Sequence, residues 1–260
     1  MMRWILPFTA SLGLMAQDGI QGPLVGWTYE ASTASLRAIQ GIPGSSMLGA
    51  RAGADLRGAA TAPGGAYAVA IRAETGEARL LDLRNGESRK LDVAEGADGI
   101  FLSPRGTAAV LHYREQGRAV LLTGLPGEVT VAAPFESSAR SFAVSDDGKA
   151  VMAVEESGVR LFDGDANQWN LNHSEAVVYA AFLEGRHDAV LAGPTGVYLV
   201  REANGNASVE KLWEGDAVAA VVEGNTAVVA ERNGGLLAVD VRNNEVRRLE
   251  CACTPVTLVR

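Results

Sequence analysis

The chain has 260 residues, of which 47% are hydrophobic and 21% are charged, and this composition is typical of a folded protein with a sizeable core. Its formal net charge is −8, so we expect no binding to nucleic acid, whose phosphates require a basic surface. The sequence contains no polybasic segment that would hold it on an anionic membrane.

The first 16 residues have the features of a signal peptide. Arg3 supplies a positive charge, residues 4–15 form a short apolar stretch, and Ala16 is a small residue at the expected cleavage point. Twelve residues that include a proline are too few to span a bilayer. A buried first strand and an uncleaved membrane anchor are the alternatives. We expect residues 17–260 to form one periplasmic or secreted domain that is not inserted in the membrane after cleavage.

A unit of about 40 residues repeats through the rest of the chain, as in propellers and other repeat architectures. Each unit has a short apolar run, a tight turn with glycine, and further alternating runs separated by turns. The turn glycines, at spacings of 41, 42, 37 and 39 residues, are Gly65, Gly106, Gly148, Gly185 and Gly224. A second landmark, the end of an alternating run, follows 15 to 17 residues later near Asp82, Thr123, Asp163, Val200 and Asp240.

The chemistry of each unit predicts a blade of four β-strands. Residues 69–71 and 151–154 mix small and branched apolar side chains, as expected for strands buried between neighbouring blades. Residues 50–62 come nearest to a helical pattern, but glycines interrupt them and we expect a loop followed by a strand. The turns use residue pairs that accept positive φ, namely Asn85-Gly86, Asp147-Gly148, Asn204-Gly205 and Asn243-Asn244. The predicted fold class is all-β, a β-propeller of about six four-stranded blades.

The two ends of the repeat complement each other. Residues 253–260 align with the innermost strand of the preceding repeat, residues 217–224, whereas Gly22 opens the first repeat with no inner strand before it. Residues 254–260 could therefore supply the inner strand, and residues 24–39 the next two strands, of one shared blade. The alternative is a seven-bladed propeller that has been truncated.

Two segments resemble blades of the WD-repeat and YVTN-type propellers, in which an Asp-Gly turn precedes a strand ending in aspartate. They are residues 145–165 (SDDGKAVMAVEESGVRLFDGD) and 75–92 (TGEARLLDLRNGESRKLD). The chain lacks the Gly-His pair and the Trp-Asp dipeptide of the WD pattern. Residues 26–44 and 253–260 are similar to exported bacterial propeller-like proteins with no assigned function. The resemblance implies a propeller but no particular activity, because propellers serve as binding proteins, lactonases, dehydrogenases and scaffolds.

The three histidines, His112, His173 and His187, fall in separate repeats and have no metal-ligand spacing. A metal site would need two or three of them to converge with carboxylates. We therefore expect that function depends on none of the three.

Two further groups are candidate ligand or redox residues. Asp163, Asp165 and Asn167 resemble the first half of a calcium loop, but Gln168 and Ser174 do not fit the second half, and a hairpin turn is the simpler interpretation. Apart from this weak calcium site we expect no cofactor. Cys251 and Cys253, the only cysteines, either form a strained local disulfide or stay as two buried thiols.

We expect a non-enzymatic propeller that binds a protein or small-molecule partner, since the sequence shows no nucleophile elbow, phosphate loop, dinucleotide fingerprint or zinc-protease motif. The alternative is a propeller hydrolase or dehydrogenase with a metal or quinone in the central channel. Such an enzyme would need polar ligands from several innermost strands. Those strands are predicted to be apolar, at residues 99–103, 141–145, 177–183 and 218–222. A third possibility is one module of a larger envelope assembly.

We predict that the chain is exported and cleaved after Ala16, because its charged, apolar and small-residue segments follow the order found in signal peptides. N-terminal sequencing of the exported protein should begin at Gln17. An intact Met1 in that material would contradict the prediction.

Overall fold

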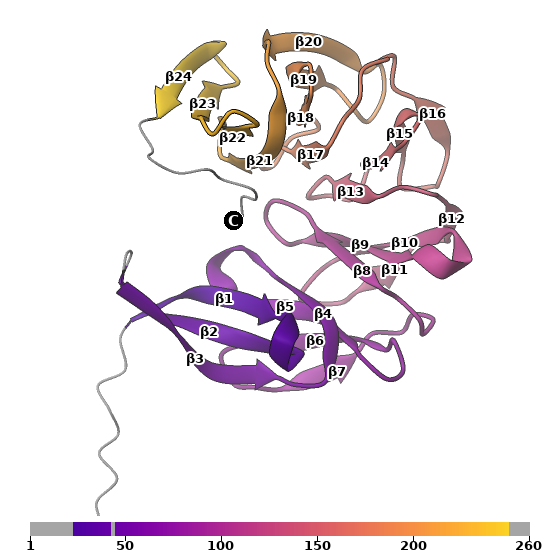
Figure 1. The fold of residues 1–260 in the computed structure, drawn as a ribbon. Helices are drawn as coiled ribbons and strands as arrows, with labels where there is room; N and C mark the ends of the chain where they lie inside the picture. Colours follow the sequence, from indigo (N-terminus) through magenta and orange to yellow (C-terminus); the bar gives the residue numbers. More distant parts are fainter. Residues whose placement is uncertain (1–22, 43–44, 250–260) are drawn as a thin grey trace, which may run out of the picture.

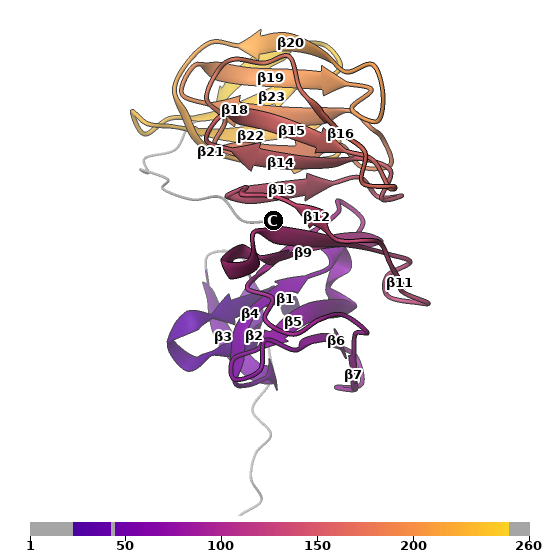
Figure 2. The same cartoon turned by 90° about the vertical axis from the view of Figure 1, so that its right-hand side faces the viewer.

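The structure is a computed structural model that describes residues 23–42 and 45–249. The described residues form 24 β-strands in six sheets, with three short 3-10 turns and no α-helix, which confirms the all-β prediction. The sheets follow one another around a central space as six blades, and within each blade the strands succeed one another from the centre outward (Figure 1). Figure 2 shows successive blades stacked face to face.

The strands of the first three blades have the following bounds. The first blade contains β1 (Leu24–Glu30), β2 (Ser35–Ile42) and β3 (Ser45–Gly53). The second blade contains β4 (Leu56–Thr61), β5 (Tyr67–Arg72), β6 (Ala78–Asp82) and β7 (Ser88–Lys90). The third blade contains β8 (Gly99–Leu102), β9 (Ala108–Tyr113), β10 (Arg118–Thr123) and a divided outer strand, β11 (Thr130–Val131) and β12 (Phe135–Glu136), both parts of which pair with β10.

The last three blades each have four strands. The fourth blade contains β13 (Ser141–Val144), β14 (Val151–Glu155), β15 (Gly158–Phe162) and β16 (Gln168–Asn170). The fifth blade contains β17 (Tyr179–Phe182), β18 (Ala189–Gly193), β19 (Gly196–Arg201) and β20 (Ser208–Trp213). The sixth blade contains β21 (Ala217–Glu223), β22 (Thr226–Glu231), β23 (Leu236–Asp240) and β24 (Glu245–Leu249). The 3-10 turns are η1 (Ala31–Thr33), η2 (Pro63–Gly65) and η3 (Arg114–Gln116).

The turn glycines of the repeat lie between the first and second strands of their blades. All five have a positive φ, between 58 and 74°. At Gly106 a side chain would also meet Ala62 and Tyr67 of the second blade, so glycine is required there by both conformation and space. The predicted positive φ occurs at Gly86, Gly148 and Asn244, whereas Glu202, and not Asn204-Gly205, takes the left-handed conformation in the fifth blade.

The interpretation of residues 50–62 as a loop and a strand was wrong in its first half. Residues 45–53 and 56–61 are both strands, β3 and β4, joined by a tight turn in which Asp55 has a φ of 55°. The glycines that interrupted the helical pattern are Gly53, on the outer strand β3 of the first blade, and Gly58, on the inner strand β4 of the second blade. Pairing of these strands with β2 and β5 stabilises an extended backbone there.

The core lies between the blades. Five hydrophobic clusters occur among the described residues, and each joins one blade to the next. The second strands of the second to fifth blades contribute to clusters on both of their faces; β9, for example, is buried along its whole length. The outermost strands β7 and β24 are largely exposed, so polar residues are tolerated there.

The strands of the first blade can be placed by one repeated hydrogen bond. In the second and third blades, a left-handed glycine ends the turn before the third strand, and its carbonyl accepts a hydrogen bond from the segment leading into the next blade. The pairs are Gly76 with Gly96 and Gly117 with Ser137. Ala34, also left-handed, accepts the same bond from Leu56 at 2.9 Å. Therefore β1, β2 and β3 are the second, third and outer strands of their blade, as the repeat predicted.

The inner strand of the first blade is not among the described residues, and β1 forms the inner edge of its sheet there. The expected pairing of residues 256–259 with residues 24–28 lies outside the described residues. The six-bladed arrangement itself is the one that the sequence predicted.

We predict that residues 254–260 complete the first blade, because an inner edge with apolar side chains favours a further strand. Deletion of residues 250–260 should lower the free energy of unfolding by at least about 3 kcal/mol, roughly the value of burying two large aliphatic side chains. Urea denaturation measures this change. An unchanged unfolding midpoint in the deletion variant, with Arg260→Ala as the control, would contradict the prediction.

Candidate functional site

The blades surround a central cavity of about 870 Å³. Its wall is formed by the ends of the inner strands and the turns that follow them, and it combines polar atoms with apolar side chains that include Leu102, Phe142, Val144, Phe182 and Val221. Among the described lining residues Glu223 is the only carboxylate, and no histidine, lysine or arginine is present. The innermost strands are therefore as apolar as the sequence predicted.

The first blade contributes different side chains to this cavity. Leu24 and Val25 of β1 are 55% and 52% exposed, and Trp27 and Ile39 also line the cavity. In the other five blades the second and third strands are covered by an inner strand. The buried indole N–H of Trp27 has no hydrogen-bond partner among the described residues.

One carboxylate joins three blades at the rim of the cavity. Asp146 lies in the turn between β13 and β14, and its two oxygens accept hydrogen bonds at 2.7 Å from the backbone N–H groups of Arg105 and Gly185. Those two residues occupy the equivalent turns of the third and fifth blades. The Arg105 Nε also donates to Glu184 at 3.0 Å. The rim is thereby fixed across three successive blades.

His187 takes part in the same rim. Its Nε2 lies 3.0 Å from the Asp147 carboxylate, which also accepts a hydrogen bond from the Ser145 hydroxyl at 2.9 Å. Partial burial acts to raise the pKa of Asp147, but the hydrogen bonds from Lys149, Ser145 and His187 outweigh it and lower the pKa. Asp147 is therefore ionised and fully engaged in holding the turn.

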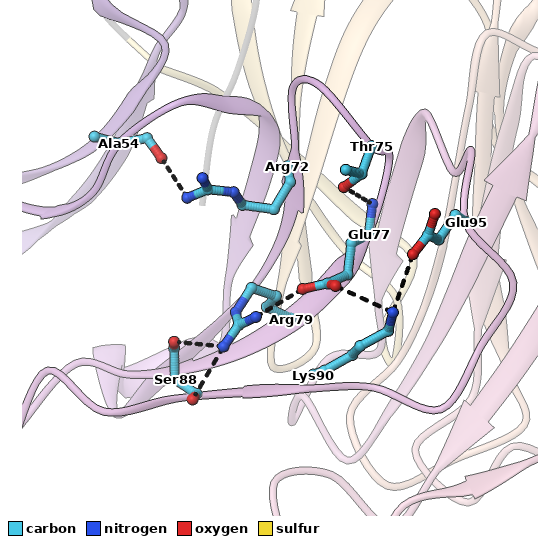
Figure 3. A network of polar contacts seen from close by, with 8 residues as sticks. All are labelled: Ala54, Arg72, Thr75, Glu77, Arg79, Ser88, Lys90 and Glu95. Atoms are coloured by element: carbon cyan, nitrogen blue, oxygen red, sulfur yellow. Dashed lines mark hydrogen bonds and ion pairs between the residues drawn. The ribbon is translucent and has the colours of Figure 1, made fainter.

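A separate ionic network lies on the second blade (Figure 3). Glu77 contacts Arg79 at 2.6 Å and Lys90 at 3.1 Å, and Lys90 also contacts Glu95 at 3.0 Å. Hydrogen bonds from Arg79 and Lys90 lower the pKa of Glu77. Every charge in this exposed chain of contacts has an opposite partner, so the network links β6, β7 and the following segment rather than presenting a free acid or base.

The three histidines lie in different parts of the propeller and make different contacts. His187 belongs to the rim, whereas His173 packs edge-on against Tyr198 with ring centroids 4.5 Å apart, and burial lowers its pKa. His112 is buried on β9 against Phe142 of the next blade, with ring centroids 5.0 Å apart. They share no site.

Asp163, Asp165 and Asn167 form a hairpin turn. The Asp163 carboxylate accepts hydrogen bonds from the backbone N–H groups of Asp165 and Asn167 and from the Asn167 amide, at 2.8 to 2.9 Å. Partial burial acts to raise the pKa of Asp163, but these hydrogen bonds lower it. In residues 23–42 and 45–249 no three histidine, cysteine, aspartate or glutamate side chains are grouped so as to hold a metal ion. Cys251 and Cys253 lie outside the described residues.

Sequence reasoning missed the contacts of Asp146. The Asp-Asp-Gly turn was recognised, but nothing in a linear repeat shows that its first aspartate reaches two other turns, which lie 41 and 39 residues away. Each turn satisfies the sequence rule for a hairpin by itself, and only the stacking of blades brings them together.

Known structures share this arrangement at low sequence identity. A functionally unknown protein from Desulfotomaculum acetoxidans matches with a TM-score of 0.58 at 11% identity, over 85% of this chain and 80% of that one. TolB from Acinetobacter baumannii matches with a TM-score of 0.51 at 14% identity, over 88% and 63%. The dihydro-heme d1 dehydrogenase NirN, in complex with DHE, matches with a TM-score of 0.55 at 16% identity, over 74% and 45%.

The chain is a six-bladed β-propeller. It spans less than two thirds of the TolB and NirN chains, as it does of U3-55K, at 64%. No family model and no curated protein matches its sequence. At these identities the similarity establishes the propeller fold alone. The part of the propeller that the structure describes contains no helix long and apolar enough to cross a membrane.

We predict that Asp146→Ala destabilises the propeller by about 1–3 kcal/mol, because two backbone N–H groups in different blades lose a charged acceptor. Chemical denaturation measures the change. Asp240→Ala is the matched control, since the Asp240 carboxylate accepts hydrogen bonds only within its own hairpin. Equal losses in the two variants would show that the links between blades add nothing beyond the turn itself.

Proposed function

We propose that the propeller is a non-enzymatic binding or scaffold module that acts in the periplasm or outside the cell. Its partner, a protein or a small molecule, would insert an apolar group into the mouth of the central cavity. The observation that carries this proposal is a cavity of about 870 Å³ whose lining side chains are mainly apolar, a size suited to a ligand or to several side chains.

The wall favours binding over catalysis in the channel. A metal or quinone enzyme would require polar ligands from several blades to converge on the axis. Glu223 is the only carboxylate among the described lining residues, and it has no second acid or imidazole beside it in that wall. Apolar burial, in contrast, needs no special residue types and gains about 25 cal/mol for each Å² removed from water.

The rim favours binding in a second way. Asp146 connects the turns of three blades, so the entrance on that side is ordered before a partner arrives. A preorganised entrance reduces the conformational entropy that association would otherwise cost. The extracytoplasmic location rests on the leader of residues 1–16 alone.

The cavity can be tested by placing a charge in its wall. Val221 lines the cavity on β21, whereas Val246 lies on β24 of the same blade and is 40% exposed. Val221→Asp should weaken binding of the neutral apolar fluorophore N-phenyl-1-naphthylamine at least tenfold, because a carboxylate in an apolar wall must be desolvated. Val246→Asp, the same change outside the cavity, should bind as the wild type does.

Fluorescence titration with all three proteins gives the result. Circular dichroism at the same temperature confirms that the variants are folded, and Tyr179→Lys supplies a second cavity variant if Val221→Asp does not fold. Equal affinity of the wild type and a folded cavity variant, or no binding by the wild type, would refute the proposal.

A further inference from the structure

A second pocket, separate from the central cavity, lies between the third and fourth blades. Its volume is about 460 Å³. It is bordered by the turn between β9 and β10 and by the segment that leads from β12 to β13. Its lining residues are His112, Arg114, Gly117, Ser137, Ser138, Ala139 and Arg140.

His112 is an exception to the internal repeat. It lies on the face of β9 that packs against the fourth blade and pairs with Gly99, the first residue of the inner strand. The corresponding side chains in the second, fourth and fifth blades are buried and apolar, namely Ile71, Val154 and Ala192. An imidazole at this position is therefore not required by the packing between blades.

The ring of His112 makes no hydrogen bond of ordinary geometry with the described residues. The residue is 1% exposed, and neither ring nitrogen has a partner among the described residues. A buried polar group in this state destabilises the folded protein unless a partner satisfies it. Burial lowers the pKa of His112 and Arg114 acts in the same direction, whereas Asp98 and a contact with the Ser137 backbone act to raise it. The ring is therefore neutral at pH 7 and carries one N–H donor, which lies beside the Ser137 backbone.

The outer strand of the third blade departs from the repeat at the same place. It is divided into β11 and β12, and the chain then passes over the end of β9 before it enters β13. Two backbone hydrogen bonds of 2.9 Å fix this passage, from Ser137 to the Gly117 carbonyl and from Arg140 to the Val154 carbonyl. The irregular segment thereby places Ser137, Ser138 and Arg140 beside His112.

The two arginines give the pocket a positive entrance. Arg114 and Arg140 are exposed, and in the described structure neither guanidinium group has a hydrogen bond or ion pair. Two acidic side chains are close to the pocket, although neither lines it. Asp98 accepts a hydrogen bond from the Arg114 backbone, and Glu155 is paired with Arg160 and accepts a hydrogen bond of 3.4 Å from the Ser137 hydroxyl. Two unpaired cations in a chain of net charge −8 form a local site for an anion.

We propose that this pocket binds a small oxyanion, a carboxylate or phosphate group. The guanidinium groups of Arg114 and Arg140 hold its oxygens, the Ser137 and Ser138 hydroxyls border it, and the neutral His112 ring donates a hydrogen bond from behind. Arginine suits this task because its planar donors match the oxygens of both anions. The site is independent of the apolar cavity, so the two proposals can fail separately. This role of His112 is contrary to the expectation from the sequence that function depends on none of the three histidines.

The experiment is a thermal melt of the mature protein in sodium phosphate, in sodium acetate and in chloride buffer, at one ionic strength and pH 7. At an anion concentration ten times the dissociation constant, the melting temperature should rise by about 3–5 °C. A rise in acetate alone identifies a carboxylate site, and a rise in phosphate alone identifies a phosphate site. No rise in either anion overturns the proposal.

Variants then assign the effect to the pocket. Arg114→Gln combined with Arg140→Gln should melt at the wild-type temperature in chloride and lose the anion response, with affinity reduced at least tenfold in calorimetry. Arg186→Gln combined with Arg242→Gln is the control, because it removes the same charge from exposed arginines elsewhere. An unchanged response in the first pair, or an equal loss in the control pair, overturns the proposal.

The variant His112→Val tests whether the ring binds the anion or serves only the packing between blades. Valine is the residue of the fourth blade at this position, so the variant should melt at or above the wild-type temperature in chloride and yet bind the anion at least tenfold more weakly. A purely structural histidine would give the opposite pattern, a lower melting temperature with an unchanged anion response. That pattern would overturn the role of the ring.

Discussion

The burial of the second strands of the second to fifth blades between their neighbours is the interaction on which the rest of the propeller depends. On β5, Ala68 and Ala70 pack towards the first blade while Val69 and Ile71 pack towards the third. A four-stranded sheet by itself would expose both faces to water, so no blade is expected to be stable alone. The blades are therefore stabilised by their neighbours, and small and branched residues alternate so that the faces fit closely.

This constraint also determines where polar chemistry can be placed. The faces of the blades are committed to packing and the inner strands are short, so charged side chains lie mainly at the turns and on the third and outer strands. The ion pairs of Glu77 and Lys90 illustrate the outer position, and Asp146 illustrates the turn (Figure 3). Binding surfaces of this propeller are accordingly the mouth of an apolar cavity and the loops between blades, where side chains are not required for the core.

Positions at which one blade differs from the others indicate function better than the positions that the blades share. Four of the five complete blades have a continuous outer strand, whereas the outer strand of the third blade is divided. The same blade has His112 where the second, fourth and fifth blades have an aliphatic side chain. A position that breaks the local pattern without a gain in packing is expected where function, rather than stability, has determined the residue. Asp146 differs from His112 in this respect, because its hydrogen bonds to two other turns stabilise the arrangement of the blades.

The sequence by itself determined the all-β class, the repeat, the positions of the turns and the apolar character of the inner strands, because each of these depends on residues close together in the chain. The five turn glycines have the positive φ that their spacing indicated. Residues 50–62 were partly misjudged, since glycine within a strand is tolerated only when a neighbouring strand pairs with it. The contacts of Asp146 and the pocket beside His112 depended on the tertiary structure. Both join segments of different blades, and the distance between two turns in space is fixed by how the blades stack, which no local pattern records.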